Sequence, residues 1–264
     1  MSEGHGTFTG ERLSGGGDEE FTVDMERHLA AYRWIAAQAA GKRVLDAGCG
    51  EGYGTAMLAG AAAHVVGLDR AEAVSVARAR HRAPNLEYRV YDLERLAALG
   101  ERFDVVVSCQ VIEHLPEPVG FLRGLAACVA PGGTLIVTTP NRLRTLVENP
   151  YHLREWTAPE LLALAQPVLP AVRVLAMRAS PRVIAYEDAR GAHIRRIMRL
   201  DPLNLRRLLP EALVRRAFAF FARLVRRRVG AEGAIPAVGP EDFDVGADGF
   251  ERALDLVLVA PAPA

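Results

Sequence analysis

The sequence has few of the features that mark several large classes of protein. It contains three cysteines among 264 residues, Cys49, Cys109 and Cys128, and they form neither a metal-spaced pair nor an even disulfide framework. No apolar run is long enough to span a bilayer, and no signal-peptide pattern opens the chain. The formal net charge is zero, so the overall composition gives no indication of a nucleic-acid partner. We therefore expect a reduced, cytoplasmic protein with one substantial hydrophobic core.

The most informative stretch is KRVLDAGCGEGYG, at residues 42–54. An apolar pair runs into Asp46, a cluster of glycines follows, and a small-residue run of helical character comes next. A strand, a tight glycine turn and a helix open a nucleotide-binding α/β unit. Glycine allows positive φ and lets a ligand approach the backbone, while the helix points its free N–H groups at that ligand. NAD, FAD and S-adenosylmethionine (SAM) proteins share such a turn, so the turn alone does not choose among them.

The rest of the chain continues this alternation of strands and helices. Strands are expected at residues 43–46, 64–69, 86–91, 103–109 and 134–139, with short loops and helices between them. This order requires a parallel sheet with helices on both faces, and ligands bind such sheets at the carboxyl ends of the strands. Polar residues and a glycine of the first turn lie at those expected ends: Asp46, Gly48, Asp69, Asp92, Gln110 and Asn141.

Asp69 and Asp92 each have two interpretations. Asp69 ends the second strand about twenty residues after the glycine turn, where a carboxylate accepts hydrogen bonds from both ribose hydroxyls. The alternative for Asp69 is an N-cap of the helix that begins at residue 71. Asp92 follows the third strand, and the alternative for it is a turn-forming aspartate.

Three segments resemble motifs of the class I SAM-dependent methyltransferases: VLDAGCGEGYGT, QVIEHLPEP after the fourth strand, and APGGTLIVTTPN. The resemblance covers about residues 40–165. It implies a Rossmann-like α/β fold, with a seven-stranded, mostly parallel sheet and an antiparallel last strand. It also implies an enzyme of class EC 2.1.1.- that uses SAM and releases S-adenosylhomocysteine (SAH), with Asp92 on the adenine amino group. The expected cofactor-binding residues are Asp46, Gly48, Cys49, Gly50, Tyr53, Asp69, Arg70, Asp92, Leu93 and Gln110.

Two histidines are candidate general bases for a hydroxyl acceptor, because histidine exchanges protons near neutral pH. His114 follows the fourth strand, where the resemblance implies a position beside the sulfonium. His152 lies in NPYHLREWTAPEL, which is similar to a segment of ubiquinone-biosynthesis O-methyltransferases. A structural turn role for His114, or transfer by proximity alone, remains open. Some of those relatives hold a divalent ion with Glu-x-x-Glu-His, whereas this chain has Gln110-x-x-Glu113-His114, so no metal is expected.

We expect one methyltransferase domain with an insertion. Its parts are a flexible leader (1–20), an N-terminal cover helix (21–40), a SAM-binding core (41–178), a basic helical insertion or lid (179–250), and the last strand with a tail (251–264). TGER at residues 9–12, with the helix after it, resembles the opening of one methyltransferase subgroup. Packing on the sheet or contact with a ligand are the alternatives for His28 and Tyr32. Strand six, at 172–177, should pair with the last strand at 253–259.

The insertion is strongly basic between Arg190 and Arg228, and residues 230–249 read as a loop. It carries an amphipathic helix that docks on the core, covers an anionic substrate, or touches an anionic membrane surface as a peripheral contact. The expected apolar face is formed by Leu213, Val214, Ala217, Phe218, Phe221 and Leu224.

The leading functional hypothesis is methyl transfer to a small-molecule or saccharide acceptor, at a hydroxyl oxygen. A non-catalytic SAM- or SAH-binding protein, or an N- or C-methyltransferase, is the alternative. An NAD-dependent oxidoreductase is disfavoured, because G-x-G-x-x-G is missing and the only lysine, Lys42, precedes the first strand. A nucleic-acid methyltransferase is disfavoured because no Asn-Pro-Pro-Tyr tetrapeptide follows the fourth strand. The oligomeric state is left open.

Overall fold

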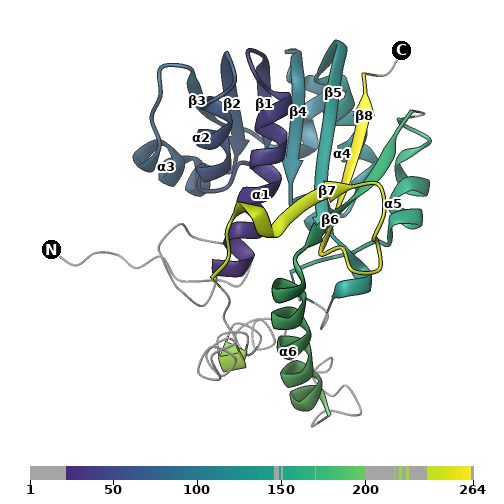
Figure 1. Cartoon of the computed structure of the whole chain (residues 1–264). Coiled ribbons are helices and arrows are strands. Elements are labelled where there is room, and N and C mark those ends of the chain that lie inside the picture. Colours follow the sequence, from purple (N-terminus) through teal and green to yellow (C-terminus); the bar gives the residue numbers. More distant parts are fainter. Residues whose placement is uncertain are drawn as a thin grey trace, which may run out of the picture.

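A single mixed sheet forms the centre of the molecule (Figure 1). The computed structural model describes residues 22–145, 149, 151–169, 171–199, 217, 220, 221, 224, 225 and 237–262. The strand order is β3-β2-β1-β4-β5-β8-β6-β7. The strands are β1 (Arg43–Ala47), β2 (His64–Asp69), β3 (Leu86–Val90), β4 (Phe103–Cys109), β5 (Val129–Pro140), β6 (Arg173–Ala179), β7 (Phe243–Gly246) and β8 (Asp255–Pro261).

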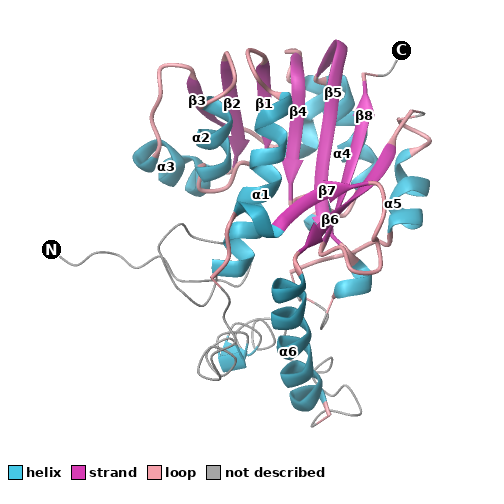
Figure 2. Cartoon of the chain, viewed as in Figure 1, coloured by secondary structure: helices cyan, strands magenta, loops and turns pink. Residues whose placement is uncertain are grey.

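Helices lie on both faces of this sheet (Figure 2). The α-helices are α1 (Thr22–Gln38), α2 (Tyr53–Ala59), α3 (Ala71–Arg80), α4 (Pro118–Ala127), α5 (Ala158–Ala165) and α6 (Pro181–Met198). The short 3-10 helices are η2 (Leu93–Ala98), η3 (Ile112–His114), η4 (Arg142–Arg144) and η6 (Pro240–Asp242). One hydrophobic core lies under α1, α2 and the start of α6, and a second lies under α4, α5 and η2. The central strands read as continuous apolar runs because both of their faces are covered.

The parallel strands all end at one edge of the sheet. Strands β1, β2, β3, β4 and β5 pair in parallel, and the chain steps from β1 outward to β3 before returning to β4. The order therefore reverses between β1 and β4, which creates a crevice at the carboxyl ends of these strands. In Figure 1, α6 extends beyond the sheet on this same side.

The antiparallel end of the sheet was predicted in outline. As expected, β6 pairs with the last strand, β8, which runs antiparallel to both β5 and β6. Because β8 runs the opposite way, its first residue lies at the carboxyl edge. Asp255 is opposite Pro140 of β5 on one side and Met177 of β6 on the other.

Two expectations about this end of the sheet were wrong. The sheet has eight strands, where seven were expected, and residues 230–249 are not simply a loop. Within them, η6 and β7 form, and β7 adds to the outer side of β6 through pairs such as Ala179 with Phe243. The short run Phe243–Gly246 carries little strand signal, and its pairing with β6 decides its structure.

The insertion is described only in part. It begins with α6, whose buried residues include Val183 and Ile184. The amphipathic face expected around residues 213–224 falls mostly outside the described residues. Among the helices that the structure describes, none has both the length and the apolar character needed to cross a bilayer.

Candidate functional site

The glycine turn joins β1 to α2 and lies at the crevice between β1 and β4. Three of its glycines have backbone conformations that other residues rarely adopt, Gly48 with φ +92°, Gly50 with φ +55° and Gly52 with φ +86°. A Cβ added to Gly48 would collide with the side chain of Val111, whereas one added to Gly50 would meet nothing within 4 Å. The first glycine therefore allows close packing with the loop after β4, and the second leaves open space over the turn.

Asp69 reaches back from the end of β2 to this turn. Its Oδ2 accepts a hydrogen bond from the N–H of Gly50 at 2.8 Å, and its Oδ1 accepts one from the N–H of Arg70 at 2.7 Å. The N-cap of α3 is Arg70, and no side chain caps that helix. The carboxylate is thus directed to the turn. Asp69 does not cap α3, so the capping alternative for this residue is wrong. The Arg70 side chain is exposed beside it.

Asp46 is fully buried under the turn and is surrounded by protein donors. Thr55 donates a hydrogen bond to its Oδ2 at 2.7 Å, and the Tyr32 hydroxyl lies 3.3 Å and 3.4 Å from its two oxygens. Burial raises the pKa of Asp46 to about 7, although the hydrogen bonds from Thr55 and Tyr32 oppose the rise. Sequence reasoning did not identify Thr55, because a threonine inside a helix gives no signal of a partner nine residues away.

Helix α1 covers the turn through two side chains. Tyr32 is buried, and its ring lies edge-on to Tyr53 with centroids 6.1 Å apart. The Nδ1 of His28 lies 3.0 Å from the Tyr53 hydroxyl. Burial, and next the nearby Arg27 guanidinium, lower the pKa of His28 to about 3, so this imidazole is neutral at neutral pH. These contacts are the packing that one interpretation of His28 and Tyr32 expects, and the contact with a ligand stays a prediction.

The other expected cofactor residues lie around the same edge. Cys49 is buried in the turn, and burial raises the pKa of its thiol. Asp92 is exposed and accepts a hydrogen bond from the N–H of Glu94 at 3.0 Å, so it caps η2, and Leu93 beside it is half-buried. Gln110, at the end of β4, has φ +56°, and among the described non-glycine residues it alone has a positive φ.

The two candidate histidines are brought together by the loop at residues 149–156. His114 donates from Nδ1 to the carbonyl oxygen of Tyr151 at 2.9 Å. The N–H groups of Leu153 and Arg154 reach the carbonyl oxygen of Glu113 at 2.8 Å and 3.3 Å. With the loop held in this way, the rings of His114 and His152 meet edge to face, 4.8 Å between centroids. The sequence separation of these histidines gave no indication of this contact.

Glu113 is the buried acid of this group. It is 1 % exposed, and its Oε2 accepts a hydrogen bond from the Thr139 hydroxyl at 2.9 Å. Burial raises the pKa of Glu113 to about 7, against the attraction of His152. One ligand atom from each of Glu113, His114 and His152 lies within 4.8 Å of the others, a spacing that could hold a cation. Both ring nitrogens of His152 already have protein partners, Glu155 and Asn149, which compete with such a role.

A buried group of charges joins α1, α6 and β8 beside the site. Arg27 pairs with Asp255 at 3.4 Å, and Arg190 pairs with Asp24 at 3.5 Å and with Glu187 at 2.6 Å. Asp255 is 2 % exposed at the carboxyl edge of the sheet. No motif singled out these residues, because their common position depends on how three distant segments pack.

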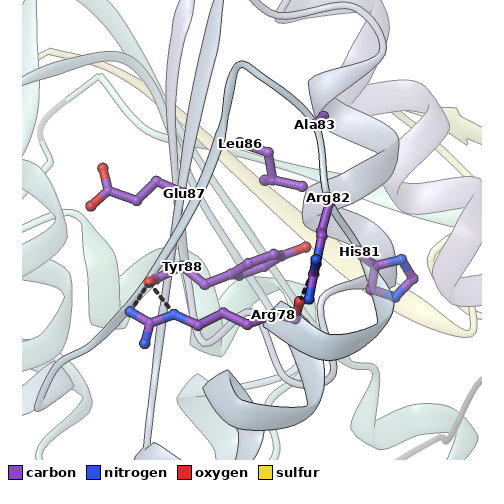
Figure 3. A pocket seen from close by; sticks show the side chains of 7 residues that line it. All are labelled: Arg78, His81, Arg82, Ala83, Leu86, Glu87 and Tyr88. Carbon is purple, nitrogen blue, oxygen red and sulfur yellow. Dashed lines mark hydrogen bonds between the residues drawn. The ribbon is translucent and has the colours of Figure 1, made fainter.

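A surface pocket of about 430 Å³ lies away from this edge, between α3 and β3 (Figure 3). Arg78 crosses it and donates to the carbonyl oxygen of Tyr88 from Nε at 3.1 Å and from Nη2 at 2.5 Å. Its lining residues are Arg78, His81, Arg82, Ala83, Leu86, Glu87 and Tyr88. None of the expected cofactor or catalytic residues lines this pocket, so the candidate site remains at the carboxyl edge.

Comparison with solved structures addresses the fold. A SAM-dependent methyltransferase from Thermotoga maritima aligns with a TM-score of 0.58 at 14 % identity, covering 93 % of this chain and 94 % of that one. A [4+2]-cyclase aligns with a TM-score of 0.54 at 18 % identity, covering 90 % of this chain and 82 % of its own. At these identities the likeness shows the fold alone, and the second match shows that the fold does not fix the reaction.

Comparison of sequences addresses the family. A protein of Mycolicibacterium smegmatis named "Probable S-adenosylmethionine-dependent methyltransferase" is 42 % identical over 164 residues, which are 60 % of this chain and 63 % of that protein. A ubiquinone biosynthesis O-methyltransferase of Cereibacter sphaeroides is 38 % identical over 127 residues, 47 % of this chain and 50 % of that protein. The chain thus spans less than two thirds of these curated relatives. A family model described as a methyltransferase domain matches residues 23–209. The chain therefore belongs to the class I SAM-dependent methyltransferases, a family whose cofactor is S-adenosylmethionine.

Proposed function

We propose that this protein transfers a methyl group from SAM to a hydroxyl oxygen of a small-molecule or saccharide acceptor. The observation that carries the proposal is the contact between His114 and His152, two imidazoles 4.8 Å apart beside the end of β4. Imidazole is the side chain best suited to accept a hydroxyl proton near neutral pH. The two imidazoles lie at the carboxyl edge of the sheet, where we expect SAM to bind, and a hydroxyl acceptor needs a general base at that place.

The residues of the edge fit the cofactor. The space over Gly50 is open, so the backbone there admits a ligand. The Asp69 carboxylate is half-exposed at the end of β2, as a group that accepts hydrogen bonds from the ribose hydroxyls should be. We assign the remaining contacts to Gly48, Cys49, Tyr53, Arg70, Asp92, Leu93 and Gln110, with Asp46 acting from below the turn.

SAM supplies a methyl group that its sulfonium already activates. The task of the protein is therefore to hold the acceptor oxygen in line with that methyl group and to take its proton. As the new oxygen–carbon bond forms, the carbon–sulfur bond breaks with its electron pair moving to sulfur, and the hydroxyl proton passes to a histidine. The products are the methylated acceptor, SAH and a protonated imidazole.

The proposed acceptors are small molecules or saccharides, and no nucleic acid or metal is part of the proposal. Three free cysteines fit the reducing cytoplasm as the compartment. We retain the subdivision of residues 1–264 into a leader, cover helix, core, basic insertion and tail. The amphipathic helix of the basic insertion remains a candidate for peripheral contact with a membrane surface. The proposal assigns no oligomeric state.

The test begins with calorimetric titration of the purified protein with SAH, with NADH as a control. Binding of SAH alone supports the cofactor. Hydroxylated sugars and natural products are then screened as acceptors with SAM. His152→Ala and His114→Ala should bind SAH as the wild type does and lose turnover. Full turnover in both variants would remove the general base from the proposal, and SAH binding without any turnover would favour a non-catalytic binding protein.

A further inference from the structure

His152 has a close acidic partner that the sequence motifs did not identify. Its Nδ1 lies 2.5 Å from Oε1 of Glu155, and the two side chains are 15 % and 9 % exposed. The second carboxylate oxygen, Oε2, accepts a hydrogen bond from the Thr145 hydroxyl. Both oxygens of Glu155 are therefore held, and the carboxylate has a fixed direction toward the imidazole.

The charge state of Glu155 decides which partner donates. Burial would raise the pKa of this carboxyl group, but hydrogen bonds from His152 and Thr145 outweigh burial and lower the pKa below its usual value. An ionised carboxylate only accepts hydrogen bonds, so the hydrogen in this contact belongs to the imidazole, on Nδ1.

The other ring nitrogen gives the same answer independently. Nε2 of His152 lies 2.9 Å from Nδ2 of Asn149, and an amide nitrogen is a donor. Nε2 is therefore the accepting nitrogen and carries the lone pair. The contacts to Glu155 and Asn149 specify the same neutral tautomer.

The loop that carries Asn149, His152 and Glu155 is hydrogen-bonded to residues at the end of β4, where we expect the acceptor to bind. His114 and Glu113, which follow β4, hold the loop through Tyr151, Leu153 and Arg154. These contacts place the His152 ring against the His114 ring at the carboxyl edge. Many enzymes place a general base next to the nucleophile and orient that base with a hydrogen bond to another side chain.

We infer that Glu155 is a positioning residue for His152: it holds the imidazole with hydrogen on Nδ1, so that Nε2 accepts the proton of the acceptor hydroxyl. This inference rests on the proposed function. The acceptor hydroxyl replaces the Asn149 amide at Nε2. As the oxygen attacks the methyl carbon, its proton moves to Nε2, and the carboxylate of Glu155 stabilises the resulting imidazolium.

The first test does not need the acceptor. Long-range proton–nitrogen NMR correlations of the full chain, labelled at histidine nitrogen and saturated with SAH after EDTA treatment, report the tautomer of His152. Its signals are identified by their loss in His152→Gln. We expect the Nδ1–H form in the wild type and a smaller fraction of that form in Glu155→Ala, where Asn149 alone still favours it. Glu117→Ala removes an exposed carboxylate three residues from His114 and should change nothing. The Nε2–H form in the wild type would overturn the inference.

Comparison of Glu155→Ala with Glu155→Gln separates the effect of the His152 tautomer from the effect of the Glu155 charge. Glu155→Gln keeps an acceptor oxygen without the charge, so we expect the Nδ1–H form to persist. With the acceptor found by screening, kcat should fall by about 100-fold in Glu155→Ala and less in Glu155→Gln, with the KM for SAM unchanged. Unchanged SAH binding in calorimetry establishes that each variant is folded.

The outcomes distinguish this inference from the proposed function. Wild-type kcat in Glu155→Ala, together with an inactive His152→Ala, would reject Glu155 and leave the proposed function standing. Full turnover in His152→Ala would instead remove His152 as the base. Stoichiometric Zn²⁺ or Mg²⁺ that shifts the His152 nitrogen signals of the EDTA-treated protein would make Nε2 a ligand and would also overturn the inference.

Discussion

The backbone N–H of Gly50 donates a hydrogen bond of 2.8 Å to the carboxylate of Asp69, joining the glycine turn after β1 to the end of β2. The two residues are separated by 19 positions, and only parallel pairing of β1 with β2 brings them together. The contact holds the carboxylate at the turn before any ligand arrives. A preformed acceptor group loses less conformational entropy on binding than a mobile one.

The first prediction follows from this contact. Asp69→Ala should lower the affinity for SAH by about 100-fold, because two hydrogen bonds from ribose hydroxyls to a charged group are lost. The fold should be retained, since Asp69 is half-exposed and does not cap α3. Calorimetric titration measures the affinity, with Glu72→Ala, an exposed acid in the first turn of the same helix, as the control. Wild-type affinity in Asp69→Ala would exclude the ribose assignment.

The second prediction concerns the packing of α1 on α2. A Cβ at Gly54 would overlap the ring of Tyr32. Gly54→Ala should therefore lower the free energy of unfolding by about 1–3 kcal/mol, the usual cost of overpacking. At Gly120, in α4, an added Cβ would meet only the Glu117 side chain at 3.7 Å. Gly120→Ala should raise stability by up to about 1 kcal/mol through helix propensity.

Urea unfolding followed by circular dichroism compares these two alanine variants. A destabilisation of Gly120→Ala as large as that of Gly54→Ala would show that loss of glycine, and not the contact with Tyr32, sets the effect.

The third prediction concerns the buried charges between α1 and α6. Arg190→Met removes the cation that pairs with the buried acids Asp24 and Glu187 and should cost about 3–5 kcal/mol of unfolding free energy. Arg196→Met changes an exposed arginine of the same helix and should cost less than about 0.5 kcal/mol. Chemical denaturation measures both. If Arg190→Met were as stable as Arg196→Met, the ion pairs would not hold α6 to α1.

The fourth prediction is a pH dependence of stability. Burial raises the pKa of both Asp46 and Glu113 to about 7 in the folded protein, while an unfolded carboxyl group titrates near pH 4. The folded state therefore binds more protons between these values, so the free energy of unfolding falls as pH rises from about 4 to about 7. Each group contributes up to about 1.4 kcal/mol per pH unit in this window.

Asp46→Asn and Glu113→Gln each remove one of these contributions. Chemical denaturation at pH values between 5 and 8 gives the free energy of unfolding as a function of pH. Its slope should be shallower for each variant than for the wild type, and above pH 8 the slopes should be equal. Parallel wild-type and variant curves would mean that the two carboxyl groups do not titrate as their burial implies.

The sequence by itself determined the parallel half of the sheet and the edge where ligands bind. Apolar runs that end in Asp46, Asp69 and Gln110 fix the strands, and parallel strands connected by helices end on one side. It also determined the start of α5, where Oε2 of Glu160 accepts hydrogen bonds from the N–H and hydroxyl of Thr157, both at 2.8 Å. These features follow from local patterns.

The tertiary structure decided the features that depend on distant segments. The strand Phe243–Gly246 forms because β6 offers it a free edge. The pair Arg27–Asp255 arises from the packing of α1 on β8, and the contact of His114 with His152 arises from the anchoring of the 149–156 loop on Glu113. A single arginine or glutamate has no periodicity of its own. Its partner is set by three-dimensional packing, and so is the chemistry that the pair performs.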